Sequence, residues 1–384
     1  MKKIVSITMV KNESDIIESF VRYSLNIFDE MIILDNGSSD NTLEILNLLK
    51  NENSPLHIII DENKEYDQAN IMNKLLLKAV YEHSADIIVP VDVDEFLISE
   101  SGNPLDELKN LGDNSFYYIK WKTYIPDFEK NLDEKFIPSK ITHVRDENLE
   151  KYYKVILSNE LVTKYNVKLT TGNHDLIIGE KSKDKVKPTI NNNLKFAHFP
   201  IRSKEQALSK ILVGWLQMIT KNYYKEGDGR HWEKIFNEIV ENRKITNEDV
   251  IEFSKQYALF DEKNITVFED SMDLSFCENV QIKYLENGTD ITFDLIENYQ
   301  WLNLQLKAIR KKNIKEQERL KYEIKKLSLE ANTILNQKNI EIEQIKNLKN
   351  QKIKELKNKI NSYKNSMSWK ITLPLRKLRN MFRQ

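Results

Sequence analysis

Residues 87–96 read Ile-Ile-Val-Pro-Val-Asp-Val-Asp-Glu-Phe, an apolar run that leads into three carboxylates within four positions. A buried strand does not carry unpaired charges in its interior, so the acidic residues are expected where the strand ends. Open α/β sheets bind ligands outside the carboxyl ends of their strands. Asp92 and Asp94 share one side of an extended backbone, because side chains alternate with period two. They supply half of a site for Mg²⁺ or Mn²⁺, although an acidic turn or a helix cap is the more ordinary explanation of an isolated pair.

The preceding residues alternate between strand and helix patterns. Apolar runs that end in polar or acidic residues predict strands at residues 4–10, 30–34, 56–60 and 86–91. Helical spacing predicts helices at residues 14–25, 41–49 and 68–83, with Ser14 as the first cap and Ser39 or Asp40 as the second. This order predicts an α/β fold with a doubly wound, mostly parallel sheet and helices on both faces.

The rest of the chain changes character twice. Further strand patterns occur at residues 116–121, 153–155 and 195–200, and residues 203–259 have a helical pattern. From about residue 294, glycine and proline vanish apart from Pro374. Apolar residues there repeat at 4-3-4-3 spacing, at Leu320, Ile324, Leu327, Ala331 and Ile334. This spacing predicts a long coiled-coil helix, with a single solvated charged helix as the alternative.

The last segment, residues 368–383, combines large apolar residues with five cations and no acid. Such a helix suits an anionic membrane surface, and packing against its own protein is an equal alternative. We therefore expect four parts, at residues 1–215 (α/β domain), 216–293 (mainly helical extension), 294–365 (coiled coil) and 366–384 (basic amphipathic tail).

Composition excludes several classes of protein. The formal net charge of −1 gives no field that attracts nucleic acid. Glycine is scarce, with 9 residues, and no glycine-rich phosphate loop pattern is present. The single Cys277 excludes a disulfide framework and fits a reducing cytoplasm. We expect neither a signal peptide nor a membrane-spanning segment, since no apolar run is long enough.

Three stretches carry a family resemblance. Residues 5–13 read Val-Ser-Ile-Thr-Met-Val-Lys-Asn-Glu, residues 33–42 read Ile-Leu-Asp-Asn-Gly-Ser-Ser-Asp-Asn-Thr, and residues 91–96 read Val-Asp-Val-Asp-Glu-Phe. In this order, at strand ends, they resemble family 2-like glycosyltransferases of the GT-A fold with their DXD motif, over roughly residues 1–215. His-Phe-Pro-Ile-Arg-Ser at residues 198–203 resembles a bacterial subgroup. Ser-Trp-Lys-Ile-Thr-Leu-Pro-Leu-Arg at residues 368–376 is similar to tails of bacterial cell-surface polysaccharide glycosyltransferases.

The resemblance implies a nucleotide diphosphate sugar as donor and a divalent metal, Mn²⁺ or Mg²⁺, as cofactor. It makes Asp94 the first metal ligand, with Asp92 near the ribose or sharing the cation through water. His198 completes the metal shell or is a buried structural histidine. Asp35 accepts from a nucleobase N–H, with a turn or cap role as the alternative. The other nucleotide-sugar-binding candidates are Val10, Lys11, Asn12, Glu13, Asp61 and Asn73.

Family members often carry an arginine beside the position of Asn73, and this chain has none there. Arg202, Lys204 or Lys11 would have to face the phosphates instead. An inverting enzyme also needs a carboxylate that deprotonates the acceptor hydroxyl. The usual Glu-Asp signature is absent, and Gly172-Asn173-His174-Asp175 is the best substitute, with Asp175 as the base and His174 near acceptor or metal. Glu95 is a second candidate, with a cap role as the alternative.

These features predict a metal-dependent glycosyltransferase that moves a sugar to a cell-surface glycan or a lipid-linked acceptor, with inversion. We expect it in the cytoplasm, self-associated through the coiled coil, with its tail at the inner face of the cell membrane. A sugar nucleotidyltransferase is disfavoured because residues 10–13 lack the glycine that such enzymes need. A coiled-coil assembly protein with a degenerate transferase domain stays open because the base is unclear.

Overall fold

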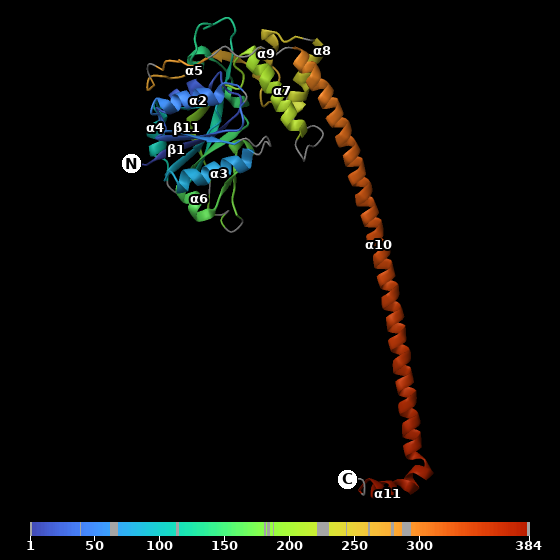
Figure 1. Ribbon diagram of the computed structural model, residues 1–384. Helices are drawn as coiled ribbons and strands as arrows, with labels where there is room; N and C mark the ends of the chain where they lie inside the picture. The colour runs from blue at the N-terminus through green and yellow to red at the C-terminus, as the bar shows by residue number, and fades with distance from the viewer. Residues whose placement is uncertain are drawn as a thin grey trace. The chain divides into compact units, whose positions relative to one another are not determined.

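Figure 1 shows the computed structural model of the 384-residue chain. The described residues are 2–38, 40–61, 68–112, 115–179, 182, 185–186, 188–220, 230–242, 244–259, 262–277, 280–285 and 293–381. The chain divides into two compact units, Met1–Leu304 and Gln305–Gln384.

The first four strands form a parallel sheet in the order β4-β1-β2-β3. The elements are β1 (Ile4–Val10), α1 (Ile17–Ser24), β2 (Glu30–Asp35), α2 (Thr42–Asn51), β3 (Leu56–Ile60), α3 (Gln68–Tyr81) and β4 (Ile87–Pro90). Phe20 of α1 and Ile45 of α2 share one apolar core with Ile4, whereas Leu75 of α3 shares a second core with Val5. Figure 1 accordingly shows α2 and α3 on opposite faces of the sheet. The expected doubly wound α/β class, with helices on both faces, is confirmed.

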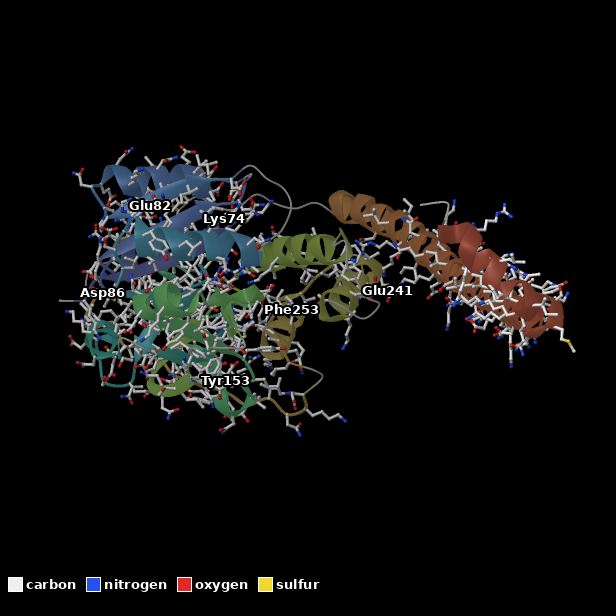
Figure 2. The ribbon with its side chains drawn as sticks, turned by 90° about the horizontal axis from the view of Figure 1, so that it is seen from below. Lys74, Glu82, Asp86, Tyr153, Glu241 and Phe253 are labelled. Carbon is white, nitrogen blue, oxygen red and sulfur yellow. The ribbon has the colours of Figure 1, made fainter. Side chains whose placement is uncertain are left out.

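In the part of the chain that the structure describes, six later strands extend the sheet to ten and make it mixed. They are β5 (Glu95–Ser99), β6 (Phe116–Ile125), β7 (His143–Arg145), β8 (Tyr153–Ser158), β11 (Pro188–His198) and β12 (Val267–Glu269). β8 lies antiparallel between β4 and β6, while β11 runs parallel to β6. The expected parallel order therefore holds for the first four strands. Because β8 is antiparallel to β4, it begins at the edge of the sheet where β4 ends. In Figure 2, Asp86, directly before β4, and Tyr153, the first residue of β8, accordingly lie at opposite edges of the sheet.

Shorter elements and three helices complete the first unit. The short elements are α4 (Pro104–Lys109), α5 (Ile137–Lys140), η1 (Glu147–Leu149), α6 (Asn159–Tyr165), β9 (Lys168–Leu169), η2 (Thr171–Asn173) and β10 (Leu176–Ile177). The helices are α7 (Lys204–Thr220), α8 (Arg230–Asn242) and α9 (Asn247–Gln256), which lie within the region expected to be helical.

The expected cap of α1 is wrong, whereas one of the two expected for α2 bonds to its first residue. Ile16 precedes α1 without a side-chain capping bond, and Ser14 lies outside the helix. The Ser14 backbone N–H donates instead to Asp40 Oδ2, at 3.1 Å. Asn41 directly precedes α2, but Asp40 Oδ1 accepts from the backbone N–H of Thr42, the first residue of α2, at 3.0 Å, and Ser39 lies outside the described residues. The loops after β1 and β2 bond to each other, and this tertiary contact outweighs local capping.

The second unit consists of the far part of α10 (Phe293–Asn365) and of α11 (Met367–Met381). The long helix expected from residue 294 is confirmed. Within one chain its apolar residues are solvent-exposed, with Ile324 66% and Leu327 64% exposed. Residues 382–383 of the basic segment lie outside the described part. Among the helices that the structure describes, none has the length and apolar character needed to cross a bilayer. Pairing of the helix with another chain and the four-part division stay predictions.

Candidate functional site

The carboxyl edge of the sheet gathers segments that are far apart in the sequence. Val10 and Asp35 are register partners where β1 and β2 end. The end of β11 joins them, because the backbone N–H of Phe199 donates to the carbonyl oxygen of Asp94 at 2.8 Å. The edge therefore brings the acidic motif together with the residues after β1, β2 and β11.

A buried lysine holds Asp92. Lys154 Nζ, on β8, lies 2.5 Å from Asp92 Oδ2 and 3.0 Å from Glu95 Oε1. Asn173 Nδ2 donates to Asp92 Oδ1 at 3.4 Å. Burial alone would lower the pKa of Lys154, whose side chain is 1% exposed, but Asp92 and Glu95 outweigh burial and raise that pKa. β8 thus supplies a fixed positive charge beside the motif.

Asp94 contacts a second lysine. Lys210 Nζ, on α7, lies 2.6 Å from Asp94 Oδ2 and also donates to the carbonyl oxygen of Pro200 at 3.0 Å. Asp94 is 7% exposed. Burial alone would raise the pKa of Asp94, but Lys210 foremost, with His198 and Arg202, holds it well below its usual range. Asp94 is therefore an ionised carboxylate at neutral pH.

Glu95 points into the protein. Its Oε1 accepts from Trp121 Nε1 at 2.7 Å, and its Oε2 accepts from the backbone N–H of Asp92 at 3.2 Å. Burial raises the pKa of Glu95 to about 8, although Lys154 opposes the shift. Lys154 is a third partner, so both oxygens of Glu95 bind groups of the protein itself. This placement favours a supporting role for Glu95 over contact with an acceptor hydroxyl.

His198 stacks on Trp121, with ring centroids 4.3 Å apart and planes at 23°. Burial holds the pKa of His198 well below its ordinary value, so its imidazole is neutral. Its Nε2 lies 3.8 Å from Asp94 Oδ2, and its buried Nδ1 has no hydrogen-bond partner among the described residues. A neutral imidazole beside an ionised carboxylate fits a divalent cation. Lys154 holds Asp92 away from Asp94 and His198. Within the described residues, these three side chains do not form a group of converging ligand atoms.

Asp35 has one satisfied and one unsatisfied carboxylate oxygen. Oδ1 accepts from the backbone N–H of Ser38 at 3.1 Å, within a turn where Gly37 has φ 69°. Oδ2 is buried, and so is Asn36 Oδ1, and neither has a partner in the described part of the chain. A buried acceptor without a donor is costly, so a ligand N–H at this position would be favourable. The turn role and the recognition role of Asp35 are therefore compatible.

Arg202 fastens the segment after β11 to the loop after β1. Its Nε and Nη2 donate to Asp15 at 2.7 and 2.8 Å, and Nη2 also donates to Glu13 Oε2 at 2.5 Å. The backbone N–H of Asn12 donates to Ser38 Oγ at 3.0 Å, so this loop is also joined to the Asp35 turn. The geometry favours a fastening role for Arg202 over contact with phosphate.

The remaining nucleotide-binding candidates lie at different distances from the motif. Lys11 is half-buried directly after β1. The backbone N–H of Asp61 donates to the carbonyl oxygen of Asp35 at 2.9 Å, which places Asp61 beside the turn. Asn73 Nδ2 donates to the carbonyl oxygen of Leu169 at 3.0 Å, and Asn73 Oδ1 accepts from the backbone N–H of Leu169 at 2.8 Å. Asn73 therefore ties α3 to β9.

η2 brings residues 172–175 to the same edge. Gly172 has φ 76°, and a Cβ there would lie 2.5 Å from the His174 ring, so the turn requires glycine. His174 Nδ1 lies 2.8 Å from the carbonyl oxygen of Tyr153, and burial lowers the pKa of His174. Asp175 is exposed, and its Oδ1 accepts from Tyr118 Oη at 2.6 Å. Its Oδ2 makes no hydrogen bond within the described residues, so Asp175 is the most accessible of the three base candidates.

The two lysines that contact the motif were missed in the sequence. Lys154 is a lysine inside the apolar run of β8, and such a position is a signal for a buried ion pair. No local pattern marks Lys210, because only the packing of α7 brings it to Asp94.

Residues 6–152 match the family model of glycosyl transferase family 2. Poly-beta-1,6-N-acetyl-D-glucosamine synthase of Staphylococcus aureus (strain MSSA476) is 34% identical over 94 residues, which are 23% of this chain and 22% of that protein. The same synthase of strain MW2 matches equally well. The chain thus spans about a fifth of the length of the curated relatives it matches.

Two solved structures show a weaker likeness. S. aureus TarS has a TM-score of 0.35 and 12% identity, covering 64% of this chain and 44% of TarS. The second is glucosyl-3-phosphoglycerate synthase from Mycobacterium tuberculosis, in complex with Mn²⁺, UDP and glucosyl-3-phosphoglycerate. It has a TM-score of 0.27 and 17% identity, and the match covers 56% of this chain and 80% of the synthase.

A doubly wound sheet with an Asp-x-Asp pair at its carboxyl edge, together with the family match, defines a glycosyltransferase domain. Over residues 6–152 the chain is similar to glycosyl transferase family 2. The expected resemblance to this family, and with it the expected glycosyltransferase class, is confirmed over these residues.

Proposed function

We propose that the chain transfers a sugar from a nucleotide diphosphate sugar to a cell-surface glycan or lipid-linked acceptor, with inversion at the transferred carbon. The observation that carries the proposal is the buried Asp94 carboxylate, which lies between Lys210 and His198 at the carboxyl edge. The buried Lys154 and the half-buried Lys210 add two ammonium groups where a diphosphate leaving group would gain charge, and fixed charges of this kind stabilise such a transition state.

Asp94 and His198 are the residues that would hold a divalent cation, Mn²⁺ or Mg²⁺. When bound, such a cation neutralises charge that develops on the diphosphate. Asp92, which Lys154 holds through a 2.5 Å contact, would share the cation only through water or lie nearer the ribose. Lys210 shares Asp94 Oδ2 with the expected cation position, and its second bond, to Pro200, keeps it at the edge when it releases that oxygen.

Asp35 and Asp175 are assigned to the two substrates. The unpartnered Oδ2 of Asp35 would accept from an N–H of the nucleobase, because the loop after β1 and the turn after β2 are already bonded together around it. Asp175 would deprotonate the acceptor hydroxyl through its unbonded Oδ2, while Tyr118 holds Oδ1.

The decisive experiment follows the products formed by the purified full-length chain with Mn²⁺ and a panel of nucleotide sugars. Release of nucleoside diphosphate supports the transferase, whereas pyrophosphate-dependent release of nucleoside triphosphate identifies a nucleotidyltransferase. Neither turnover nor nucleotide binding identifies a degenerate domain. Asp94→Asn is expected to lower turnover by about a hundredfold. Asp86→Asn is the matched control, because Asp86 precedes β4 at the other end of the same strand.

A second function, self-association, rests on α10. Leu320, Ile324, Leu327, Ala331 and Ile334 occupy successive seam positions, and the single chain leaves Ile324 and Leu327 largely exposed. We propose that a second copy of this chain covers the seam, since the 4-3 spacing fits a two-stranded coiled coil.

The basic helix α11 would then dock on an anionic membrane surface from the cytoplasm. Arg376, Lys377 and Arg379 lie on α11, whose first turn carries no acidic residue, and Ile371 and Leu375 are exposed. Basic residues near an anionic surface each contribute about 1 kcal/mol. Co-flotation of the full chain with vesicles of anionic lipid, and its loss in neutral vesicles, tests this docking.

A further inference from the structure

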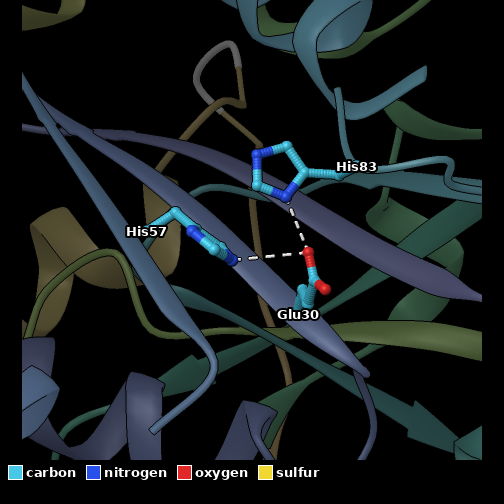
Figure 3. A group of neighbouring side chains, drawn as sticks. All are labelled: Glu30, His57 and His83. Atoms are coloured by element: carbon cyan, nitrogen blue, oxygen red, sulfur yellow. Dashed lines mark hydrogen bonds and ion pairs between the residues drawn. The ribbon is translucent and has the colours of Figure 1, made fainter. Parts of the chain in front are cut away.

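Glu30, His57 and His83 converge at the amino edge of the sheet, opposite the acidic motif (Figure 3). Glu30 begins β2, His57 is the second residue of β3, and His83 follows α3. His57 is the register partner of Ile32 on β2, and Ile32 lies in the core under α3. Glu30, two residues before Ile32, projects from the same face, so the strand register itself brings the three side chains together.

The spacing of their ligand atoms suits one small ion. His83 Nδ1 lies 2.6 Å and His57 Nε2 lies 3.4 Å from the same oxygen, Glu30 Oε2. Around a tetrahedral zinc ion with ordinary bond lengths, ligand atoms lie about 3.3 Å apart. The His57 contact already has this spacing, and the His83 contact reaches it by opening about 0.7 Å.

Lys3 orients the carboxylate. Lys3 Nζ lies 2.6 Å from Glu30 Oε1, which leaves Oε2 directed at the two histidines. Ligating carboxylates are commonly held by such outer contacts. The side chains of Glu30, His57 and His83 are 22%, 44% and 12% exposed, so an ion has access from solvent and water can fill a fourth position. Burial and then the neighbouring His83 lower the pKa of His57, which keeps its nitrogen available as a ligand.

We propose that Glu30, His57 and His83 bind one divalent transition-metal ion, and that Zn²⁺ is the ion they fit best. Two imidazoles and one carboxylate, with an open position, form a ligand set that zinc accepts. The ion joins β2, β3 and the end of α3, and therefore stabilises the folded chain, because the unfolded chain does not hold these residues together. The site is distinct from the carboxyl edge, since Glu30 and Asp35 are the first and last residues of β2, about 17 Å apart.

The test uses the full-length chain carrying Asp94→Asn, which removes the main expected ligand at the carboxyl edge. After chelation, the protein is titrated with Co²⁺ and then with Zn²⁺ while visible absorption is recorded. We expect one equivalent of Co²⁺ to give the strong bands of a four-coordinate ion, Zn²⁺ to abolish them, and Zn²⁺ to raise the melting temperature. Adding His57→Gln or His83→Gln removes all three signals, and Lys3→Ala weakens binding about tenfold.

His143→Gln is the matched control, because His143 is a half-buried histidine on β7 and lies outside the cluster. Failure to bind one equivalent, or binding that survives both cluster substitutions, overturns the proposal and leaves an ion-pair network. Circular dichroism checks the folding of each variant. If the more buried His83 variant misfolds, the His57 variant still decides the question.

Discussion

The ammonium group of Lys210 lies 2.6 Å from Asp94 Oδ2, across 116 residues of sequence. The contact joins α7 to the acidic motif and places a positive charge where a divalent cation would also bind. Lysine and cation would therefore compete for this one oxygen, and Lys210 supplies the positive charge when no metal is bound.

Lys210→Ala is expected to separate metal binding from turnover. Without the ammonium group, Mn²⁺ affinity should rise about tenfold, because a nearby like charge has been removed. Turnover should fall about a hundredfold, because a positive charge facing the diphosphate has also been lost. Calorimetric Mn²⁺ titration and release of nucleoside diphosphate measure the two effects. Lys164→Ala breaks a surface pair with Glu160 and should change neither, while unchanged Mn²⁺ affinity in Lys210→Ala would refute the competition.

Asp35→Asn is expected to weaken nucleotide binding without weakening the fold. The substitution removes the charge-assisted part of a hydrogen bond to the base, which corresponds to about tenfold in affinity for the nucleoside diphosphate. The melting temperature of the free protein should not fall, because Asp35 Oδ2 has no partner among the described residues. Asp29→Asn is the contrasting variant, since Asp29 Oδ2 accepts from the backbone N–H of Ile4 at 2.8 Å. It should lower stability and leave nucleotide affinity intact; the reverse pattern would contradict the assignment of Asp35.

Glu52→Gln is expected to lower stability in a pH-dependent way. Hydrogen bonds from Arg22 and then Tyr284 lower the pKa of Glu52 from 4.5 to about 2. Because the folded pKa lies below the unfolded one, this contribution is fully present above pH 4.5 and is lost as pH falls through about 2. The difference in free energy of unfolding between wild type and variant should thus narrow as pH falls below 4.5, as measured by urea titration at a series of pH values. A difference that stays constant from neutral pH to about pH 3 would sink this explanation.

Leu327→Lys is expected to break self-association. A lysine at a seam position places charge inside a two-stranded coiled coil, whereas Leu329→Lys places it on the outer face. The two leucines are 64% and 67% exposed in the single chain, so exposure alone does not distinguish them. Light scattering during size exclusion should give a dimer for wild type and Leu329→Lys, and a monomer for Leu327→Lys. A monomeric wild type would rule out the seam.

Much of the fold was predictable because its signals are local. β1 and β3 begin and end where their apolar runs do. The place of β8 was not predictable, because its antiparallel pairing of Ser158 with Ile87 depends on contacts between distant segments. The expected Ser14 cap of α1 failed for the same reason, since the Ser14 backbone N–H is used in a contact with Asp40 between two loops.

The residues of the candidate site likewise differ in whether a local pattern predicts them. Asp35, Asp94 and His198 could be expected together, because strand ends of a parallel sheet meet at one edge. Lys210 could not be expected there, since no pattern in α7 shows which way its lysine points. Arg202 was one of the cations expected near phosphate because no arginine lies beside Asn73, but it binds carboxylates of the loop after β1.

The Arg202 contacts also bear on how the chain is synthesised. Asp15 and Glu13 leave the ribosome 187 and 189 residues before the cation that neutralises them, and Asp94 precedes Lys210 by 116. Until those cations emerge, burying the carboxylates would carry the full cost of unpaired charge. The edge can close only after Lys210, about two thirds of the way along the first unit, has been translated. A product that ended at residue 152 would carry every motif of the family match and still lack an assembled site.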